Sequence, residues 1–215
     1  GAVYYLESDP FTKVIVHGTY TTSTANTWFE VQSSTGQICY YGNTTGARQS
    51  YTAGNSPRIY AWYLDYVEDP LGNYMNYTYN KWSYCMYPNT IMYGNNKNGS
   101  TGLQNTVTFS YETRSNDPQL FVIEGVKGTM DRRLKTITSK TGSSVYRVYD
   151  LQYNTTGDAS GTKYSRLTSV TERNGAGDVM QPVKLNWSYL PSLYSIPVSP
   201  QVNAASVYPA VAFSE

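Results

Sequence analysis

Apolar and polar residues alternate along most of this chain, and one arrangement of them recurs. Each copy begins with two apolar residues three positions apart, passes through a turn and ends in a strand with apolar residues at every second position. The opening residues of the last two copies lie 33 positions apart and are Leu134 with Ile137, then Leu167 with Val170. Their return strands contain Leu151 and Tyr153, then Leu185 and Trp187. An apolar residue at every second position predicts a β-strand with one buried face.

An earlier copy contains the clearest turn in the sequence. It consists of Leu64 and Val67, the turn residues Asp69, Gly72 and Asn73, and the return-strand residues Tyr77 and Tyr79. A looser copy runs from Ile91 to Tyr111. Each hairpin is too small to bury its own face, so the repetition predicts an array of antiparallel β-hairpins packed side by side.

The rest of the chain is interpreted with the same signals. We expect one or two strands over 3–16, a hairpin formed by 28–31 and 38–41, a polar loop over 42–57 and one strand over 59–67. Farther along the chain we expect strands over 90–93 and 106–112 around a loop at 94–105. A strand over 120–130 should follow, with an irregularity at Gly125 and Gly128. No segment predicts a helix. Proline recurs after Tyr189, which indicates a linker or a strap along a sheet edge.

Composition agrees with an all-β fold. The 215 residues include 23 tyrosines and four tryptophans, which suit half-buried strands. We expect one hairpin domain over residues 1–190 and a proline-rich tail over 191–215 that leads toward a following domain. The chain begins abruptly in strand-like sequence, as a piece of a longer polypeptide would.

The charge balance excludes some partners. Sixteen basic and fifteen acidic side chains leave a net charge of +1, which gives no reason to expect nucleic acid or anionic lipid as a partner. Arg132, Arg133, Lys135 and Lys140 cluster, and we interpret them as a solvated flank of a hairpin. No run approaches the roughly 18 apolar residues of a membrane-spanning helix.

The sequence offers little catalytic chemistry. His17 is the one histidine, so a metal site with several histidines is excluded and a Ser-His-Asp triad is not expected. His17 itself is expected on the surface or in packing. Cys39 and Cys85 lack the paired spacing of a zinc site, and two free thiols are favoured over a disulfide. No phosphate-binding glycine motif is present. We therefore predict no catalytic residue, no metal and no cofactor.

Two alternatives involve carboxylates and aromatic rings. Asp65, Glu68 and Asp69 lie among aromatic residues, as they would in a sugar-cleaving site, but strand alternation points Glu68 away from the other two, and Asp69 belongs to a turn. The many tyrosines and tryptophans could stack on sugar rings, although aromatic residues at every second strand position more often pack against neighbouring strands.

The order of these segments resembles a known family. Phe29-x-Val31, Tyr40-Tyr-Gly42 and the block from Trp62 to Tyr79 are followed by Val107 to Arg114 with Asp117-Pro118, by Arg133 to Ile137, by Tyr149-x-Leu-x-Tyr153 and by Ser165 to Val170. Over residues 3–189 this is similar to the N-terminal region shared by Salmonella plasmid virulence protein B and the B subunits of insecticidal toxin complexes. Its D-x-x-G-N-x-x-x-Y-x-Y stretch resembles one RHS/YD repeat.

The resemblance implies a curved sheet of hairpins that forms part of a hollow shell around a toxin or effector. It implies a secreted or cell-surface bacterial protein whose partners are other domains of the same polypeptide or other toxin-complex subunits, and whose enzymatic domain lies elsewhere. The leading hypothesis is therefore a non-enzymatic structural module. The alternatives are an adhesin module that binds a glycan or a host surface through exposed aromatic residues and, third, a glycosidase.

Overall fold

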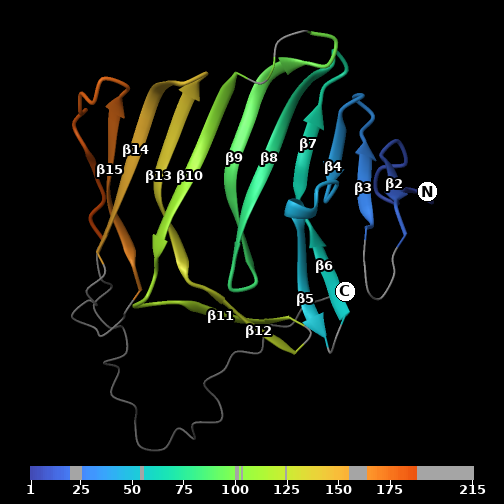
Figure 1. Ribbon diagram of the computed structural model, residues 1–215, viewed down its shortest axis with the longest axis horizontal. Helices are drawn as coiled ribbons and strands as arrows, with labels where there is room; N and C mark the ends of the chain where they lie inside the picture. Colours follow the sequence, from blue (N-terminus) through green and yellow to red (C-terminus); the bar gives the residue numbers. More distant parts are fainter. Residues whose placement is uncertain are drawn as a thin grey trace, which may run out of the picture. The chain divides into compact units, whose positions relative to one another are not determined.

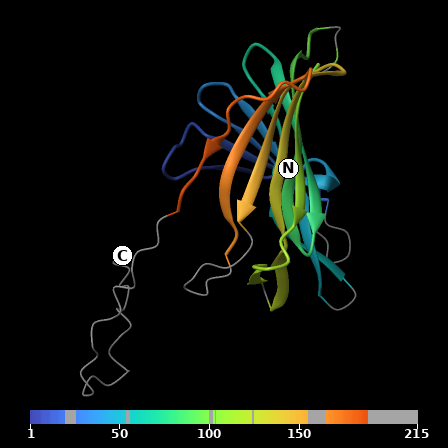
Figure 2. The same ribbon diagram turned by 90° about the vertical axis from the view of Figure 1, so that its left-hand side faces the viewer.

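The computed structural model describes residues 1–19, 26–53, 56–99, 102, 104–123, 125–154 and 164–187. The chain divides into one unit over Gly1–Leu185 and another over Asn186–Glu215, and the fold described below is that of the first unit. Its largest element is an antiparallel sheet of twelve described strands, in the order β1, β2, β3, β4, β7, β8, β9, β10, β13, β14, β15, β16 (Figure 1). The sheet is open and twisted, and its long strands are curved (Figure 2). The all-β prediction is confirmed.

The sheet strands are β1 (Val3–Tyr5), β2 (Lys13–His17), β3 (Trp28–Gln32), β4 (Ile38–Tyr41), β7 (Leu64–Glu68), β8 (Asn73–Trp82), β9 (Cys85–Asn96), β10 (Asn105–Thr113), β13 (Arg132–Thr141), β14 (Ser144–Asn154), β15 (Arg166–Asn174) and β16 (Val183–Lys184). Two further hairpins, β5 (Arg48–Ala53) with β6 (Ser56–Trp62) and β11 (Gln119–Ile123) with β12 (Val126–Met130), lie toward one end of the sheet strands (Figure 1). The helical content of the described residues is a single 3₁₀ turn, η1 (Thr45–Ala47).

The turn between β7 and β8 forms where the sequence predicts it. One oxygen of Asp69 accepts hydrogen bonds from the backbone N–H groups of Leu71 and Asn73, both at 2.9 Å. Gly72 adopts a φ of +83°, which glycine reaches without a steric cost. Strand β8 then pairs with β7 so that Met75 lies opposite Val67. This hairpin is set by local turn chemistry.

The predicted hairpin at 134–153 is also present. Strands β13 and β14 are joined by a tight turn in which Gly142 has a φ of +57°. Ile137 lies opposite Tyr149, and on the next strand pair Leu151 lies opposite Val170. The side chains of Leu151 and Tyr153 are partly buried, as are those of Tyr77 and Tyr79 in the earlier copy.

The last copy differs from the prediction at its return strand. Strand β16 contains only Val183 and Lys184, and it pairs with β15 alone. Leu185 is 38 % exposed and Trp187 is 54 % exposed, so the prediction that both belong to the buried layer is wrong. The reason is their position, because they lie at or beyond an edge strand of two residues that has no further strand beside it in the described part of the chain. Tyr189 lies outside the described residues.

The segment 42–67 is also corrected. The predicted polar loop contains η1 and strand β5, and the predicted single strand over 59–67 divides at Tyr63 into β6 and β7. Strand β6 pairs with β5, from Arg48 opposite Trp62 onward, whereas β7 joins the main sheet. The chain leaves the main sheet at a turn at Gly42, whose φ of +69° favours glycine.

Two other boundaries shift. Strand β9 continues to Asn96, into the predicted loop at 94–105, of which residues 100, 101 and 103 lie outside the description. The predicted single strand over 120–130 is instead the hairpin β11–β12, which reverses at Gly125 with a φ of +81°. Gly128 of β12 lies against the ring of Phe121, and a Cβ atom at this position would overlap that ring.

The buried part of the described chain is small. Its buried apolar side chains are those of Ala47, Tyr51, Cys85, Tyr87 and Val148. No described helix covers either face of the main sheet, so most of its side chains are only partly buried. Both small hairpins contact the turn between β8 and β9. Gln49 and Tyr60 of the β5–β6 hairpin donate hydrogen bonds to the carbonyl of Tyr84, and the Thr129 N–H of the β11–β12 hairpin donates one to the carbonyl of Ser83.

Candidate functional site

Three tyrosines fasten neighbouring strands of the sheet in the same way. Tyr79, Tyr111 and Tyr153 each follow a register shift against the next strand of the sheet. Each hydroxyl donates a hydrogen bond to a backbone carbonyl on the preceding strand or at its start. We call these three residues the tyrosine latches.

The latch distances are nearly equal. The Tyr79 and Tyr153 hydroxyls lie 2.6 Å from the carbonyl oxygens of Leu64 and Leu134, the residues that open their repeat copies. The Tyr111 hydroxyl lies 2.7 Å from the carbonyl of Pro88. Burial raises the pKa of all three phenols, that of Tyr79 to about 12, so they stay protonated donors at physiological pH. The repeat therefore has a shared hydrogen bond as well as a shared hydrophobic pattern.

Five aromatic side chains form a continuous row across strands β2, β3, β4, β7 and β8, and we call it the aromatic row. Its members are His17, Trp28, Tyr40, Tyr66 and Tyr74. Successive ring centroids are separated by 3.9, 5.1, 4.9 and 5.6 Å, and three of the four contacts are stacked. Cross-strand aromatic pairs of this kind each add about 0.5 to 1.5 kcal/mol beyond area burial. His17 is thus a packing residue, which is one of the two positions expected for it.

The carboxylates beside the aromatic row already have hydrogen-bond partners. Glu30 lies 2.8 Å from the ring nitrogen of His17. Glu68 accepts hydrogen bonds from the ammonium of Lys97 and the hydroxyl of Tyr66. The contact with Lys97 lowers the pKa of Glu68 despite burial, while burial and the Glu68 carboxylate raise that of Tyr66. A carboxylate held ionised in this way is a poor general acid.

The three carboxylates of the glycosidase alternative have separate roles. Asp65 is buried and accepts a hydrogen bond from the backbone N–H of Thr44. Glu68 is paired with Lys97, and Asp69 organises the β7–β8 turn. A register shift at Asp65 interrupts the strict alternation that the sequence argument assumed. The three carboxylates therefore have different hydrogen-bond partners.

A buried ionic joint connects the end of β10 with the start of β15. Asp117 accepts hydrogen bonds from the Arg114 guanidinium at 2.8 Å and from the backbone N–H and hydroxyl of Ser165 at 2.5 and 2.7 Å. The Arg114 hydrogen bond holds the pKa of Asp117 well below its usual range. Arg133 also donates to Ser165 and to Glu112, so it belongs to this joint. The prediction of a merely solvated basic flank is wrong for Arg133.

The remaining chemistry of the described residues is sparse. No group of three or more histidine, cysteine, aspartate or glutamate side chains in this part of the chain could hold a metal ion. Cys39 and Cys85 are both free thiols, half-buried and buried respectively. No described helix is long and apolar enough to cross a membrane. Sequence reasoning missed the latches and the Asp117 joint, although Tyr79 and Tyr153 both occupy the second return-strand position of their repeat copies.

An open antiparallel sheet of repeated hairpins, fastened strand to strand by tyrosines, defines a β-sheet scaffold. A family model described as Salmonella virulence plasmid 65kDa B protein matches residues 8–124, more than half of the chain. The chain therefore belongs to this family. A search among curated proteins found no match.

Solved structures show the same fold. The N-terminal domain of effector protein SpvB from Salmonella typhimurium strain LT2 aligns with a TM-score of 0.57 and 14 % identity, over 76 % of this chain and 65 % of that one. The crystal structure of TcdB2-TccC3 aligns with a TM-score of 0.60 and 16 % identity, over 82 % of this chain and 11 % of that one. A Photorhabdus luminescens Tc holotoxin pore aligns similarly, with a TM-score of 0.59 and 16 % identity, over 82 % of this chain and 11 % of that one.

Proposed function

We propose that this chain is a non-enzymatic structural module of a larger secreted or surface-exposed bacterial toxin-like protein. In this proposal its sheet is part of a β-shell that encloses or presents an effector, and its partners are other domains of the same polypeptide or toxin-complex subunits. The RHS/YD-like repeat residues, including Leu64 with Tyr79 and Leu134 with Tyr153, then serve to hold one curved sheet together.

One observation carries this proposal: no described helix covers either face of the main sheet, and most of its side chains are only partly buried. Large apolar side chains on β1 and β11 are also exposed, among them Tyr5 at 63 % and Leu120 at 79 %. Apolar surface of this extent, together with unpaired edge strands, favours further packing partners. Membership of a virulence-protein family and the fold of SpvB and TcdB2-TccC3 support the assignment of those partners to a toxin-like assembly.

Hydroxyl-radical footprinting tests the proposal. The chain alone and a longer polypeptide of the same gene that contains it are oxidised in parallel, and labelling of Tyr40, Tyr66 and Met92 is compared by mass spectrometry. Lower labelling of these residues in the longer polypeptide is the expected result, with buried Tyr51 as the control that stays weakly labelled in both. Equal labelling of the three residues would overturn the shell assignment.

The aromatic row favours a second function, an adhesin module that binds a glycan or a host protein. Its rings are only partly buried, so a platform for stacking remains accessible. In that case the row stays labelled in the longer polypeptide, and Tyr66→Ala weakens binding on a glycan or host-protein array.

The non-enzymatic part of the proposal has its own test. No hydrolysis is expected on a broad glycan panel, because Glu68 is held by Lys97 and Asp65 by the Thr44 N–H. Turnover that is abolished by Asp65→Asn or Glu68→Gln would overturn it.

A further inference from the structure

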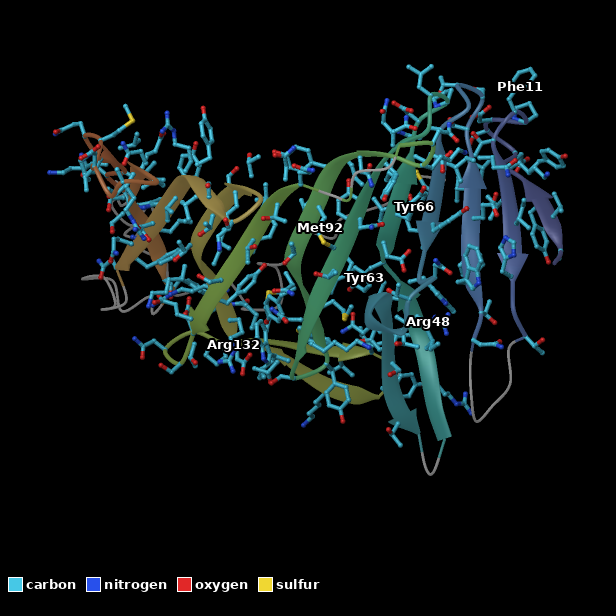
Figure 3. The ribbon with its side chains drawn as sticks, turned by 45° about the horizontal axis from the view of Figure 1, so that its top comes forward. Phe11, Arg48, Tyr63, Tyr66, Met92 and Arg132 are labelled. Carbon is cyan, nitrogen blue, oxygen red and sulfur yellow. The ribbon has the colours of Figure 1, made fainter. Side chains whose placement is uncertain are left out.

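A cavity opens where η1 and the chain before it pass over the main sheet. It has a volume of about 410 Å³, within the range of small-ligand sites, and its lining includes Thr44, Asp65, Asn76, Thr78, Tyr79 and Met92. Figure 3 shows Met92 over the central part of the sheet and Arg48 beside the segment that contains η1. This cavity belongs neither to the aromatic row nor to the Asp117 joint.

A β-bulge delivers a carboxylate to this cavity. Tyr40 pairs with Tyr66 and Tyr41 pairs with Leu64, so Asp65 is the extra residue of β7 with no partner on β4. Bulges of this kind redirect a side chain away from the regular alternation of a strand. The side chain and backbone of Asp65 together are only 4 % exposed.

The Asp65 carboxylate is half satisfied. Its Oδ2 accepts a hydrogen bond from the Thr44 N–H at 2.5 Å, whereas Oδ1 has no hydrogen-bond partner among the described residues. A buried carboxylate oxygen without a donor costs free energy, so the arrangement calls for a donor from elsewhere.

The other polar groups of the lining determine which donor fits. The Asn76 side-chain amide has no hydrogen-bond partner in the described part of the chain, and it offers both a donor and an acceptor. The hydroxyls of Thr44 and Thr78 likewise donate and accept. A ligand hydroxyl group also does both, so a ligand with several hydroxyls can satisfy this set, whereas an ammonium group can only donate.

Nearby charges point the same way. Lys81 donates to the carbonyl of Thr45 at 3.2 Å, and Arg48 donates to the carbonyls of Gly42 and Asn43 at 2.5 and 3.2 Å. These two cations lie along the segment that forms one wall of the cavity. They repel a cationic ligand, whereas a neutral ligand meets no such repulsion.

We propose that the Asp65 cavity binds a neutral polyhydroxylated ligand of the size of one pyranose unit. A ring hydroxyl donates to Asp65 Oδ1, neighbouring hydroxyls contact Asn76 and the threonines, and the apolar edge of the ring lies against Met92 and Tyr79. No chemical step accompanies binding.

Titration of the whole chain with simple glycosides tests this inference. Methyl glycopyranosides of glucose, galactose, mannose and N-acetylglucosamine are added at roughly 1 to 10 mM, the range of weak single-site affinities, and binding is followed by NMR shifts of the Met92 methyl group. At least one glycoside is expected to bind to the native chain. Asp65→Asn should weaken its affinity roughly tenfold or more, and Asn76→Ala should weaken it as well.

Matched measurements keep the inference falsifiable. Asp150→Asn makes the same carboxylate-to-amide change on β14, away from the cavity, and should leave the affinity unchanged. Butylammonium serves as the cationic probe and should not bind. The inference is overturned if no glycoside binds to the folded native chain, if butylammonium binds instead, or if Tyr66→Ala in the aromatic row abolishes glycoside binding while Asp65→Asn does not. A negative result here leaves the footprinting test of the shell proposal unaffected.

Discussion

At the scale of the residue, single side-chain hydrogen bonds reinforce the pairing of neighbouring strands. The latches Tyr79 and Tyr153 are 74 positions apart, yet each donates to the carbonyl of the leucine that opens its repeat copy. A tyrosine at this place therefore does more than fill an apolar position, because its hydroxyl crosses to the preceding strand. Phenylalanine would keep the ring and lose the connection.

Replacement of a latch tests this role. Tyr79→Phe and Tyr153→Phe should each lower the free energy of unfolding by about 1 kcal/mol, since each removes a donor from a carbonyl acceptor. The effects should add in the double variant, because the two sites share no partner. Urea denaturation measures these differences, with Tyr146→Phe as the control at an exposed position. Loss no greater than in that control would contradict the latch role.

The Asp117 joint gives a second residue-scale prediction. Asp117→Asn should destabilise the chain by about 3 kcal/mol at pH 7, because it leaves the half-buried Arg114 cation without its counter-ion. The native pKa of Asp117 lies below the unfolded value of about 3.9, so its contribution is complete above that pH and is lost as the pH falls toward the native value.

Denaturation of both proteins between pH 7 and pH 2 provides the measurement. The difference between the native chain and Asp117→Asn should be constant near neutrality and should shrink at acid pH, below about pH 4. A difference that stays the same down to pH 2 would show that Asp117 acts without its charge.

At the scale of the element, close contacts between backbone and rings position the small hairpins. Strand β12 presents Gly128 to the ring of Phe121 on β11, and this hairpin meets the β8–β9 turn through the Thr129 N–H, which donates to the carbonyl of Ser83 at 3.1 Å. Glycine is needed at position 128 because the ring occupies the space that a side chain would take. The backbone there is that of an ordinary strand and does not itself require glycine.

A methyl group at this position should disrupt the hairpin. Gly128→Ala is expected to cost about 1 to 3 kcal/mol, because the added Cβ overlaps the Phe121 ring and forces it to move. Hydrogen exchange should rise across β11 and β12 first. Gly102→Ala is the matched control with open space around it, and its effect should stay within about 0.5 kcal/mol. Equal effects of the two substitutions on the free energy of unfolding would show that the ring contact does not contribute to stability.

At the scale of the whole molecule, the described sheet ends in two edge strands, β1 and β16. Edge strands expose unpaired backbone groups, and β1 also exposes Tyr4 and Tyr5. Such edges and faces are consistent with the proposed place of the chain inside a larger assembly. They also create a risk of association when the chain is isolated.

The proline-rich tail remains a prediction at this scale, because residues 191–215 lie outside the described residues. If the tail covers an edge, its deletion should lower the melting temperature or promote association. Thermal denaturation and analytical ultracentrifugation of chains 1–190 and 1–215 would measure both. An unchanged melting temperature in a monomeric short chain would mean that the tail is only a linker.

The sequence by itself determined the hairpins that are specified by residues close together in the chain. Alternating apolar positions and the Asp69–Asn73 turn placed β7 and β8, and the same alternation placed β13 and β14, because period-2 burial and turn geometry depend on residues close together in the chain. The free thiols, and a surface or packing position for His17, also followed from residue type and spacing.

The tertiary structure alone decided everything that depends on which strands become neighbours. The sequence 59–67 reads as one strand, but the pairing of β6 with β5 and of β7 with β4 divides it at Tyr63. The bulge that carries Asp65 into a cavity arises from that same pairing. Leu185 and Trp187 continue the apolar alternation, yet they lie exposed because no strand follows β16 within the described residues. Alternation specifies which residues share a side of a strand, whereas their burial depends on the partner that covers that side.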